Sequence, residues 1–326
     1  MPSDRVWLVS PVFFDVESYT RLRQNARAAL AGQAALDVRM VAIDDTAGAD
    51  SEIRGLESLP DQLVITPPFP LGHQRALVFG LRRLSTMVGE SDLVVTLDAD
   101  GEDKPDDLPR LLAPLLQGDA SVRTVVVAAR TRRRESPSFK LFYLLFKALF
   151  QLLTGTIIRS GNYAAYRGWL THNVLFHPHF DLSYSSSLLS LGLNVHRVPC
   201  ERGSRYAGVS KMTYVKLIQH GLRMLMPFAD RIATRGLVIF SALLGLGLLG
   251  TGVLFVLEIT GTVASPGWII YTLCTGTLLC ALAAACMVIV FALFVQSQSL
   301  SLARLDVGLR PIETAEIARS AEALRL

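Results

Sequence analysis

The stretch LVVTLDADGEDKP, residues 93–105, decides the fold. The apolar run at 93–97 is typical of a buried β-strand, and it leads directly into Asp98 and Asp100. Side chains two residues apart lie on the same side of an extended segment, so the two carboxylates point to one place. Oxygen ligands of this kind suit Mg²⁺ or Mn²⁺, and a cation held there would bind a diphosphate. Glu102 is a candidate third ligand, and an acidic turn ahead of the next helix is the alternative interpretation.

Short apolar runs alternate with segments of helical spacing on both sides of this stretch. Such alternation indicates βαβ units and a mostly parallel sheet, in which ligands bind at the carboxyl ends of the strands. Asp44-Asp45 and Asp98-Asp100 both follow strands, so we expect them at one sheet edge. The predicted strands are residues 6–12, 38–43, 63–65, 93–97 and 124–129, and the predicted helices are residues 18–36, 72–88 and 105–116.

The composition describes a globular domain joined to an apolar segment. Of the 326 residues, 51% are hydrophobic and 18% are charged, which excludes a disordered chain, a collagen-like repeat and a small disulfide scaffold. The net charge of +4 is mild, and we expect no nucleic-acid partner because such proteins carry a denser basic face. The four cysteines form no CxxC zinc pattern, which favours a reducing, cytoplasmic location for the globular part.

Two uncharged segments near the C-terminus are long enough to cross a bilayer. Residues 236–257 would span ~33 Å as a helix, which matches a hydrocarbon core of ~30 Å. Residues 268–295 are long enough to span with tilt. The loop between the two segments has no Lys or Arg, whereas basic residues flank their outer ends. The positive-inside rule therefore predicts that the globular domain and both termini are cytoplasmic, and no apolar leader precedes the first strand.

Two further segments are candidates for the membrane surface. Residues 139–153 are apolar nearly all round, with lysines that would reach the headgroups, and a core helix is the alternative. Residues 212–232 mix basic and apolar residues at helical spacing just before the first span. The predicted organisation is a catalytic domain at 1–210 with an interface helix at 139–155, a juxtamembrane helix at 211–235, a transmembrane region at 236–296 and a cytoplasmic tail at 297–326.

Two groups of polar residues are candidates for contact with phosphate. His73 and Arg75 begin a predicted helix, whose free N–H groups attract anions. We expect His73 to act by position or hydrogen bonding. Arg130 closes the strand at 124–129, on the same edge as the carboxylates, and three arginines follow at 132–134. These would contact lipid headgroups or a lipid phosphate, and a solvated basic loop is the alternative.

Four motifs follow one another along the globular part: a strand ending at Pro11, the Asp44-Asp45 pair, Gly-His-Gln-x-Ala at 72–76, and Asp-Ala-Asp-Gly at 98–101. Together they resemble GT-A-fold glycosyltransferase family 2, and most of all its branch that transfers sugars to polyprenyl or dolichyl phosphate. The resemblance covers residues 5–235, and the two apolar segments match the membrane-anchored members. It implies an α/β, Rossmann-like GT-A catalytic domain followed by interfacial helices and two transmembrane helices.

The resemblance implies a donor site at the carboxyl ends of the first strands, with Asp45 at the base and Asp98 and Asp100 at the ribose, diphosphate and metal. Glu102 stands where dolichyl-phosphate mannosyltransferases often have a glutamine ligand. The chain departs from the family at residues 13–17, where FFDVE replaces the usual Tyr-Asn-Glu-Glu, and after Asp44-Asp45, where no Gly-Ser follows. The residues expected to bind the nucleotide-sugar are Pro11, Glu17, Asp45, His73, Arg75 and Asp98.

The resemblance places the acceptor side in two later motifs. Residues 160–167, SGNYAAYR, resemble the acceptor-side motif of the family, and a structural turn is the alternative. Residues 201–212, ERGSRYAGVSKM, resemble the Arg-x-x-Gly-x-Ser-Lys loop that closes over donor and acceptor phosphates, and a flexible surface loop is the alternative. Arg202 and Arg205 would act with Asp100 in catalysis, because arginine binds phosphate bidentately. The residues expected at the acceptor phosphate are Arg130, Asn162, Arg167 and Lys211.

The expected reaction follows from the acceptor. A phosphate monoester has a second pKa near ~6, so it attacks a sugar carbon without a strong general base. We expect inverting transfer from a UDP- or GDP-sugar to a polyprenyl phosphate such as undecaprenyl phosphate, with Mg²⁺ or Mn²⁺, at the bacterial plasma membrane. The product would donate the sugar for envelope glycan modification, and a homo-oligomer is compatible with the resemblance. Transfer to a diacylglycerol or a growing glycan is the alternative, with Asp103 or Asp181 as the base, and a non-catalytic membrane scaffold or lipid transporter is the third.

Overall fold

The computed structural model describes residues 4–33, 36–117, 121–130, 137–158, 160–207, 214–262 and 267–308. The chain divides into two compact units, Met1–Phe228 and Ala229–Leu326. The first unit holds the sheet and the helices that cover it, and the second holds two long helices.

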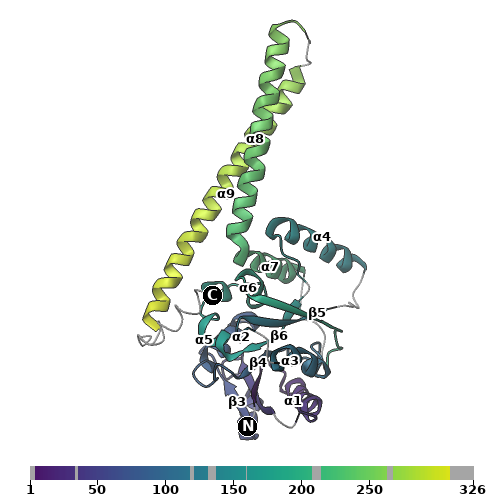
Figure 1. Ribbon diagram of the computed structural model, residues 1–326, viewed down its shortest axis with the longest axis vertical. Helices are drawn as coiled ribbons and strands as arrows, with labels where there is room; N and C mark the ends of the chain where they lie inside the picture. Colours follow the sequence, from purple (N-terminus) through teal and green to yellow (C-terminus); the bar gives the residue numbers. More distant parts are fainter. Residues whose placement is uncertain are drawn as a thin grey trace. The chain divides into compact units, whose positions relative to one another are not determined.

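The first unit is built on one seven-stranded sheet in the order β3-β2-β1-β4-β6-β5-β7 (Figure 1). All the pairings within the described residues are parallel except those of β6, which runs antiparallel to β4 and β5. The predicted α/β, mostly parallel sheet is therefore confirmed. The strands are β1 (Asp4–Val12), β2 (Leu36–Asp44), β3 (Gln62–Ile65), β4 (Leu93–Thr96), β5 (Thr124–Arg130), β6 (Ser160–Arg167) and β7 (Asn194–Cys200).

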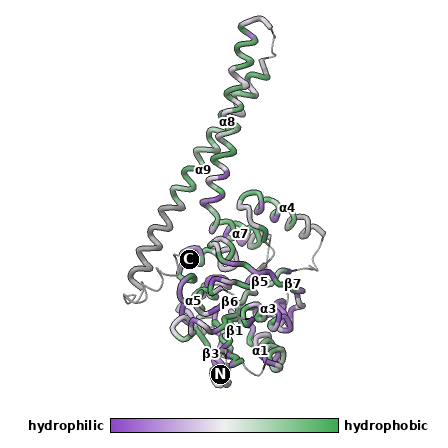
Figure 2. The backbone as a smooth tube through the Cα atoms, in the orientation of Figure 1, coloured by the Kyte–Doolittle hydropathy of each residue, from purple (hydrophilic) through white to green (hydrophobic). Residues whose placement is uncertain are grey.

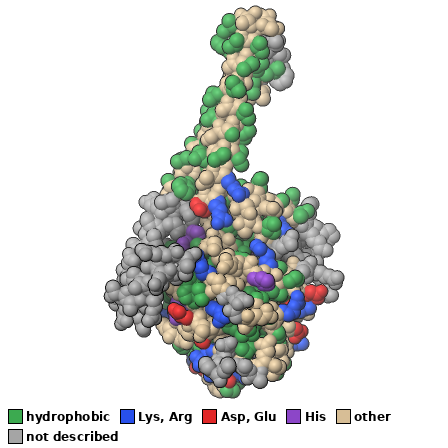
Figure 3. Space-filling view, in the orientation of Figure 1, with side chains coloured by type: hydrophobic (Ala, Val, Ile, Leu, Met, Phe, Trp, Pro, Cys, Tyr) green, Lys and Arg blue, Asp and Glu red, His purple; other side chains and the backbone are tan. Residues whose placement is uncertain are grey.

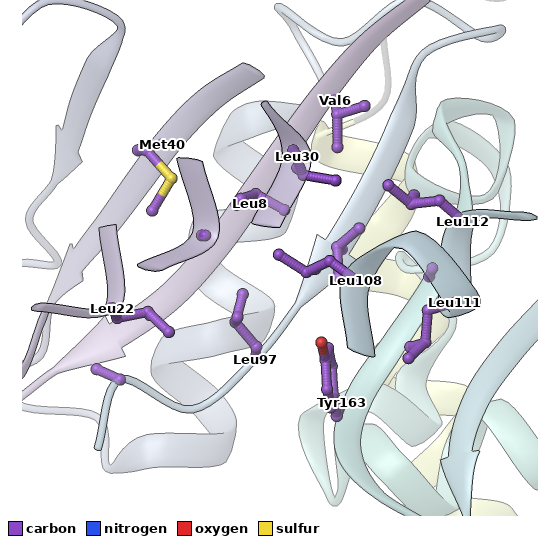
Figure 4. Packing of buried hydrophobic residues seen from close by; sticks show 14 of the residues in the cluster. Val6, Leu8, Leu22, Leu30, Met40, Leu97, Leu108, Leu111, Leu112 and Tyr163 are labelled. Carbon is purple, nitrogen blue, oxygen red and sulfur yellow. The ribbon is translucent and has the colours of Figure 1, made fainter. Parts of the chain in front are cut away.

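Helices cover both faces of this sheet because the strands alternate their buried side chains. Val6 and Leu8 of β1 belong to the cluster under α1 (Val16–Leu30) and α3 (Leu108–Leu116). Trp7 and Val9 belong to the cluster under α2 (His73–Leu84), α5 (Gly168–Asn173) and α6 (Tyr184–Ser190). Figure 4 shows the first cluster, where the helices contribute Leu22, Leu30, Leu108, Leu111 and Leu112.

Three predicted helices differ from the structure for local reasons. The helix predicted over 18–36 ends at Leu30, just before Gly32, and Leu36 begins β2 instead. The helix predicted over 212–232 is interrupted by η4 (Met226–Phe228), because Pro227 has no backbone N–H to donate. The remaining short helices are η1 (Ser51–Ser58), η2 (Pro105–Asp107), which precedes α3 within the helix predicted over 105–116, and η3 (Pro178–Asp181).

Helices α4 (Pro137–Thr154) and α7 (Tyr214–Leu225) contact each other and leave apolar side chains exposed. Phe150 of α4 is fully buried and packs edge-on against Phe228, with ring centroids 5.4 Å apart. Within the described residues, these two helices and the turn after α7 expose seven large apolar side chains. We call this set the apolar face, and it comprises Leu144, Leu145, Leu149, Leu152, Ile218, Leu222 and Met226.

The second unit consists of α8 (Ala229–Ile259) and α9 (Gly267–Gly308), which pack against each other. A methyl group added at Gly236 would lie 2.9 Å from the Met287 sulfur, so the helices are close at this glycine. Two helical stretches, Leu217–Ile259 and Ile269–Leu293, are long and apolar enough to cross a membrane, and 0% and 6% of their most apolar 18-residue windows are buried. Figure 2 shows the hydropathy along these helices, and Figure 3 shows hydrophobic side chains on their surface. The predicted pair of apolar C-terminal helices is confirmed, and the orientation of their ends stays a prediction.

Candidate active site

The two acidic segments lie at the same sheet edge, on either side of β1. Asp45 follows β2, and Asp98 and Asp100 follow β4, while β1 pairs with both strands. The Asp45 N–H donates to the carbonyl of Val12 at the end of β1 (2.9 Å), and the segment ahead of Asp98 is tied to β1 by a Leu97 N–H bond (3.1 Å). The carboxylates therefore surround the carboxyl end of β1, where ligands of parallel sheets bind.

A hydrogen-bond network holds the Asp98 side chain. His73 Nε2 donates to Asp98 Oδ1 (2.9 Å), and Asn162 Nδ2 donates to the same oxygen (3.2 Å). Gln74 Nε2 in turn donates to Asn162 Oδ1 (2.6 Å), and the backbone N–H of Tyr184 donates to Gln74 Oε1 (3.0 Å). His73 and Asn162 thus hold the Asp98 carboxylate in this structure.

The segment after β7, residues 201–207, pairs with the backbone of the acidic motif, and we call it the arginine loop. The Gly203 N–H donates to the Glu102 carbonyl (2.8 Å), and the Tyr206 N–H donates to the Asp100 carbonyl (2.8 Å). Asp103 and Arg202 form an isolated antiparallel bridge. These backbone hydrogen bonds therefore hold the arginine loop directly against residues 100–103.

The two arginines of this loop reach the acidic side chains. Arg205 Nη2 lies 2.9 Å from Asp100 Oδ2, and Arg205 Nε donates to Glu102 Oε1 (3.1 Å). Arg202 Nε donates to Glu102 Oε2 (3.0 Å), and the Arg202 Nη2 atom pairs with the same oxygen. The sequence predicted that Asp100, Arg202 and Arg205 act together, and the structure brings them to one place. Glu102, expected as a metal ligand, is instead the partner of both arginines.

Tyr206 ties the arginine loop to α1. Asn25 Nδ2 donates to the Tyr206 hydroxyl (3.0 Å), and the Arg21 guanidinium carbon lies 4.8 Å from the centre of the Tyr206 ring. Gly101 adopts a φ of +86°, and a side chain there would overlap the Tyr206 ring. Sequence reasoning missed these contacts, because α1 carries no motif that points to residues 180 positions later.

Arg130 pairs with Asp103, a buried acid that follows the Asp-Ala-Asp motif. Its Nη2 atom donates to Asp103 Oδ1 (3.1 Å), and Asp103 Oδ2 accepts the Asp98 N–H (3.1 Å). Asp103 is 3% exposed, and burial raises its pKa to about 7. In this arrangement Asp103 and Arg130 support the backbone at Asp98, rather than facing solvent.

The carboxylates Asp98 and Asp100 differ in their electrostatic environment. Although burial by itself raises the pKa of Asp98, the neighbouring His73 lowers it well below its usual range. Burial and the nearby Asp98 and Glu102 carboxylates raise the pKa of Asp100. Asp100 therefore lies beside two further carboxylates, and a divalent cation would relieve their mutual repulsion. Among the residues that the structure describes, no group of three His, Cys, Asp or Glu side chains is placed so that it could hold one metal ion.

Two of the residues predicted to bind the nucleotide, Pro11 and Asp45, make contacts within the fold. Pro11 is buried within β1 and faces Ile43 of β2. Asp45 is 4% exposed, and its Oδ1 atom accepts the N–H groups of Leu71 (2.8 Å) and Gly72 (3.0 Å). Asp45 therefore links the end of β2 to the turn that begins α2. The resemblance predicts Asp45 at the nucleotide base. Of its two carboxylate oxygens, these contacts leave Oδ2 for that role.

The remaining donor-side residues lie at helix starts near the same edge. Glu17 is exposed on the first turn of α1 and lines a groove of about 520 Å³ together with Arg21, Asn25 and Glu52. Arg75 is exposed on the first turn of α2. Neither residue is brought to the carboxylate cluster by a contact that the structure records.

Among the described acceptor-side residues, Arg167 does not join the cluster. The motif at 160–167 is the strand β6 and not a turn, so its two ends lie at opposite edges of the sheet. Asn162 lies at the acidic edge, whereas Arg167 pairs with Leu93 at the start of β4 and donates to the carbonyl of Leu115 (2.7 Å). The expectation for Arg167 is therefore corrected, because it closes the end of α3. Lys211 and the arginines at 132–134 lie outside the described residues.

The mostly parallel α/β domain, with an Asp-Ala-Asp motif at its ligand edge and an arginine loop paired to it, agrees with the GT-A fold expected from the motifs. Residues 18–171 match the family described as Glycosyl transferase family 2. The match covers slightly less than half of the chain and agrees with the family that its motifs resemble.

Several proteins of known name are similar to the chain. One from Erwinia tasmaniensis, "Undecaprenyl-phosphate 4-deoxy-4-formamido-L-arabinose transferase", is 27% identical over 66% of this chain and 65% of its own length, slightly less than two thirds. A protein of the same name from Sodalis glossinidius is 28% identical over 75% of this chain and 77% of its own. Among solved structures, a mannosyltransferase from Pyrobaculum calidifontis in complex with GDP-Man and Mn²⁺ is 17% identical with a TM-score of 0.42, covering 99% of this chain and 81% of its own.

Proposed function

We propose that the chain transfers a sugar from a nucleotide-sugar to a polyprenyl phosphate. One observation carries the proposal: Arg205 pairs with Asp100, and Arg202 pairs with the adjacent Glu102, at the ligand edge of the sheet. Transfer to a phosphate brings two anions together, so it needs carboxylates for a cation on one side and fixed cations on the other. The relatives named above support the acceptor class, since their names specify undecaprenyl phosphate.

The donor would bind around the end of β1, with its diphosphate toward Asp98 and Asp100. These two carboxylates fit Mg²⁺ or Mn²⁺ by their hard oxygen donors, and because an ion would relieve the repulsion between Asp100 and its neighbouring carboxylates. A bound ion would neutralise the leaving diphosphate.

The acceptor phosphate would be held by Arg202 and Arg205 of the arginine loop. Its oxygen attacks the anomeric carbon as the bond from that carbon to the nucleotide diphosphate breaks, and the nucleoside diphosphate leaves with inversion. Charge placement and orientation supply the rate, because the attacking dianion needs no proton removed. Asp103, which could act as a base for a hydroxyl acceptor, is buried and held by Arg130 and the Asp98 N–H.

The membrane would deliver this acceptor. Along the chain, α7 and η4 lead directly into α8, which belongs to the first candidate span. The apolar face on α4 and α7 would lie in the bilayer interface, with the arginine loop only a few residues before α7 in sequence. We retain a cytoplasmic catalytic unit with both termini on that side as part of the proposal.

The test uses the full chain in detergent with polyprenyl phosphate, Mg²⁺ or Mn²⁺ and a panel of UDP- and GDP-sugars. We expect one donor to give a metal-dependent sugar–phosphate lipid of inverted anomeric configuration, identified by mass spectrometry and NMR. Asp100→Asn should lower its formation at least ~10²-fold, and Arg167→Met serves as the control outside the cluster. Transfer only to a diacylglycerol or a glycan would refute the acceptor, and a retained configuration would refute the single displacement.

A further inference from the structure

The Glu102 side chain occupies both arginines that the proposed function assigns to the acceptor phosphate. Its Oε2 atom accepts from Arg202, and its Oε1 atom accepts from Arg205 Nε (3.1 Å). Two guanidinium groups that converge on the two oxygens of one carboxylate reproduce the geometry in which arginines bind a phosphate. The carboxylate thus presents to these arginines the same chemistry as the expected substrate group.

The position of the arginine loop does not depend on this carboxylate. The loop is fixed by backbone bonds from Gly203 to Glu102 and from Tyr206 to Asp100, both 2.8 Å long. It is fixed again by the Tyr206 hydroxyl, which accepts from Asn25 on α1. Displacing the Glu102 carboxylate would therefore leave both arginines in place and facing the site.

The charges around the site oppose an added anion while Glu102 stays between the arginines. Asp98, Asp100, Glu102 and Asp103 lie together with Arg130, Arg202 and Arg205, and Arg130 is already committed to Asp103. The Glu102 side chain is 14% exposed, so its charge is only partly screened by water. A phosphate dianion can reach the two loop arginines only at the expense of their bonds to Glu102.

We propose that Glu102 is an internal competitor of the acceptor phosphate for Arg202 and Arg205, and that it tunes the affinity of the site for that phosphate. The proposal rests on the proposed function for the role of the arginines. It replaces the expected role of Glu102 as a metal ligand. The competitor keeps the two cations paired until a doubly charged group displaces it, which favours a phosphate dianion over singly charged anions.

The test measures binding of inorganic phosphate to the full chain in detergent by calorimetry, without divalent metal. Glu102→Gln keeps the size and removes the charge, and we expect it to tighten phosphate binding about 3- to 10-fold. Glu201→Gln is the matched control, because Glu201 is on the same loop but pairs with Lys104 (3.5 Å) and not with the arginines. Its phosphate affinity should equal that of the unchanged chain.

Two further measurements separate this proposal from others. The KM for polyprenyl phosphate should fall in Glu102→Gln while the Mg²⁺ concentration needed for half-maximal rate stays the same. A raised Mg²⁺ requirement would instead identify Glu102 as a metal ligand, and unchanged or weaker phosphate binding would refute the competition. Glu102→Ala repeats the binding measurement should the glutamine variant unfold. Because phosphate binding is measured without turnover, failure of lipid transfer would overturn the proposed function and not this inference.

Discussion

Replacing Gly203 with alanine tests whether the arginine loop must lie directly on the acidic motif. A methyl group at Gly203 would overlap the carbonyl oxygen of Gly101 and would also lie 3.2 Å from Lys104 Cγ. The structure records no positive φ at Gly203, so alanine fits the backbone and the effect is purely steric. The loop must recede by about 1 Å before this contact reaches the ~3.3 Å C···O separations found in proteins.

A shift of this size moves the loop arginines away from the acids. The Gly203–Glu102 and Tyr206–Asp100 backbone bonds, now 2.8 Å, would lengthen past hydrogen-bonding range. Misplacement of catalytic groups by about 1 Å costs on the order of 10²-fold in rate. We therefore expect Gly203→Ala to lower kcat/KM for sugar transfer about 100-fold, with a loss of unfolding free energy within ~1–3 kcal/mol.

The assay follows nucleotide release and lipid product together, alongside thermal unfolding. Gly55→Ala is the matched control, because a methyl group there meets nothing within 4 Å and the residue lies in η1 on the surface. The control should keep both its rate and its stability. A Gly203→Ala enzyme with a rate within twofold of the unchanged chain would refute the reasoning.

Three further predictions follow from other contacts. Arg167→Met should cost about 1–2 kcal/mol of unfolding free energy, by removing its bond to the Leu115 carbonyl, yet leave the KM for the acceptor unchanged; a raised KM would return Arg167 to the site. Although burial by itself lowers the pKa of His73, the Asp98 carboxylate raises it, so the pair stabilises the fold fully below about pH 6.5 and less as pH rises through the raised pKa. Denaturant unfolding of His73→Gln should therefore show a stability deficit that shrinks as the pH rises above about 6.5, and a constant deficit would contradict this. Leu145→Glu with Leu152→Glu on the apolar face should raise the KM for polyprenyl phosphate at least about tenfold in vesicles but not in detergent, and an equal effect in both would argue against membrane contact.

The parallel part of the fold could be predicted because its strands are short apolar runs. The runs at 93–97 and 124–129 match the strands β4 and β5 to within one residue, and the acidic pairs lie at the predicted edge. The sequence does not predict the strand β6, because SGNYAAYR has no apolar run and resembles an acceptor-side motif. Its pairing between β4 and β5 is a tertiary effect that periodicity does not report.

The motifs predicted which residues belong to the candidate site, but not which of these residues pair with each other. Asp100, Arg202 and Arg205 come together as expected, whereas the pairing of Glu102 with both arginines joins residues 100 positions apart. Spacing along the chain carries no information on such a contact, because several acids and several arginines could pair. For the same reason the sequence assigned Arg167 and Asn162, which belong to one motif, to the same acceptor site. The antiparallel strand β6 carries the two residues to opposite sheet edges.

The out-of-order strand β6 delays completion of the candidate site during synthesis of the chain. The strands β1 to β4 and their carboxylates are complete once about the first hundred residues have been made, but the Asn162 partner of Asp98 comes from β6. The cations arrive last, on a loop that is followed directly by α7 and the apolar helices. A nascent chain therefore holds Asp100 and Glu102 without their arginine partners until its apolar segment is being made. Completion of the candidate site and synthesis of the two apolar helices are in this way set by the same stretch of chain.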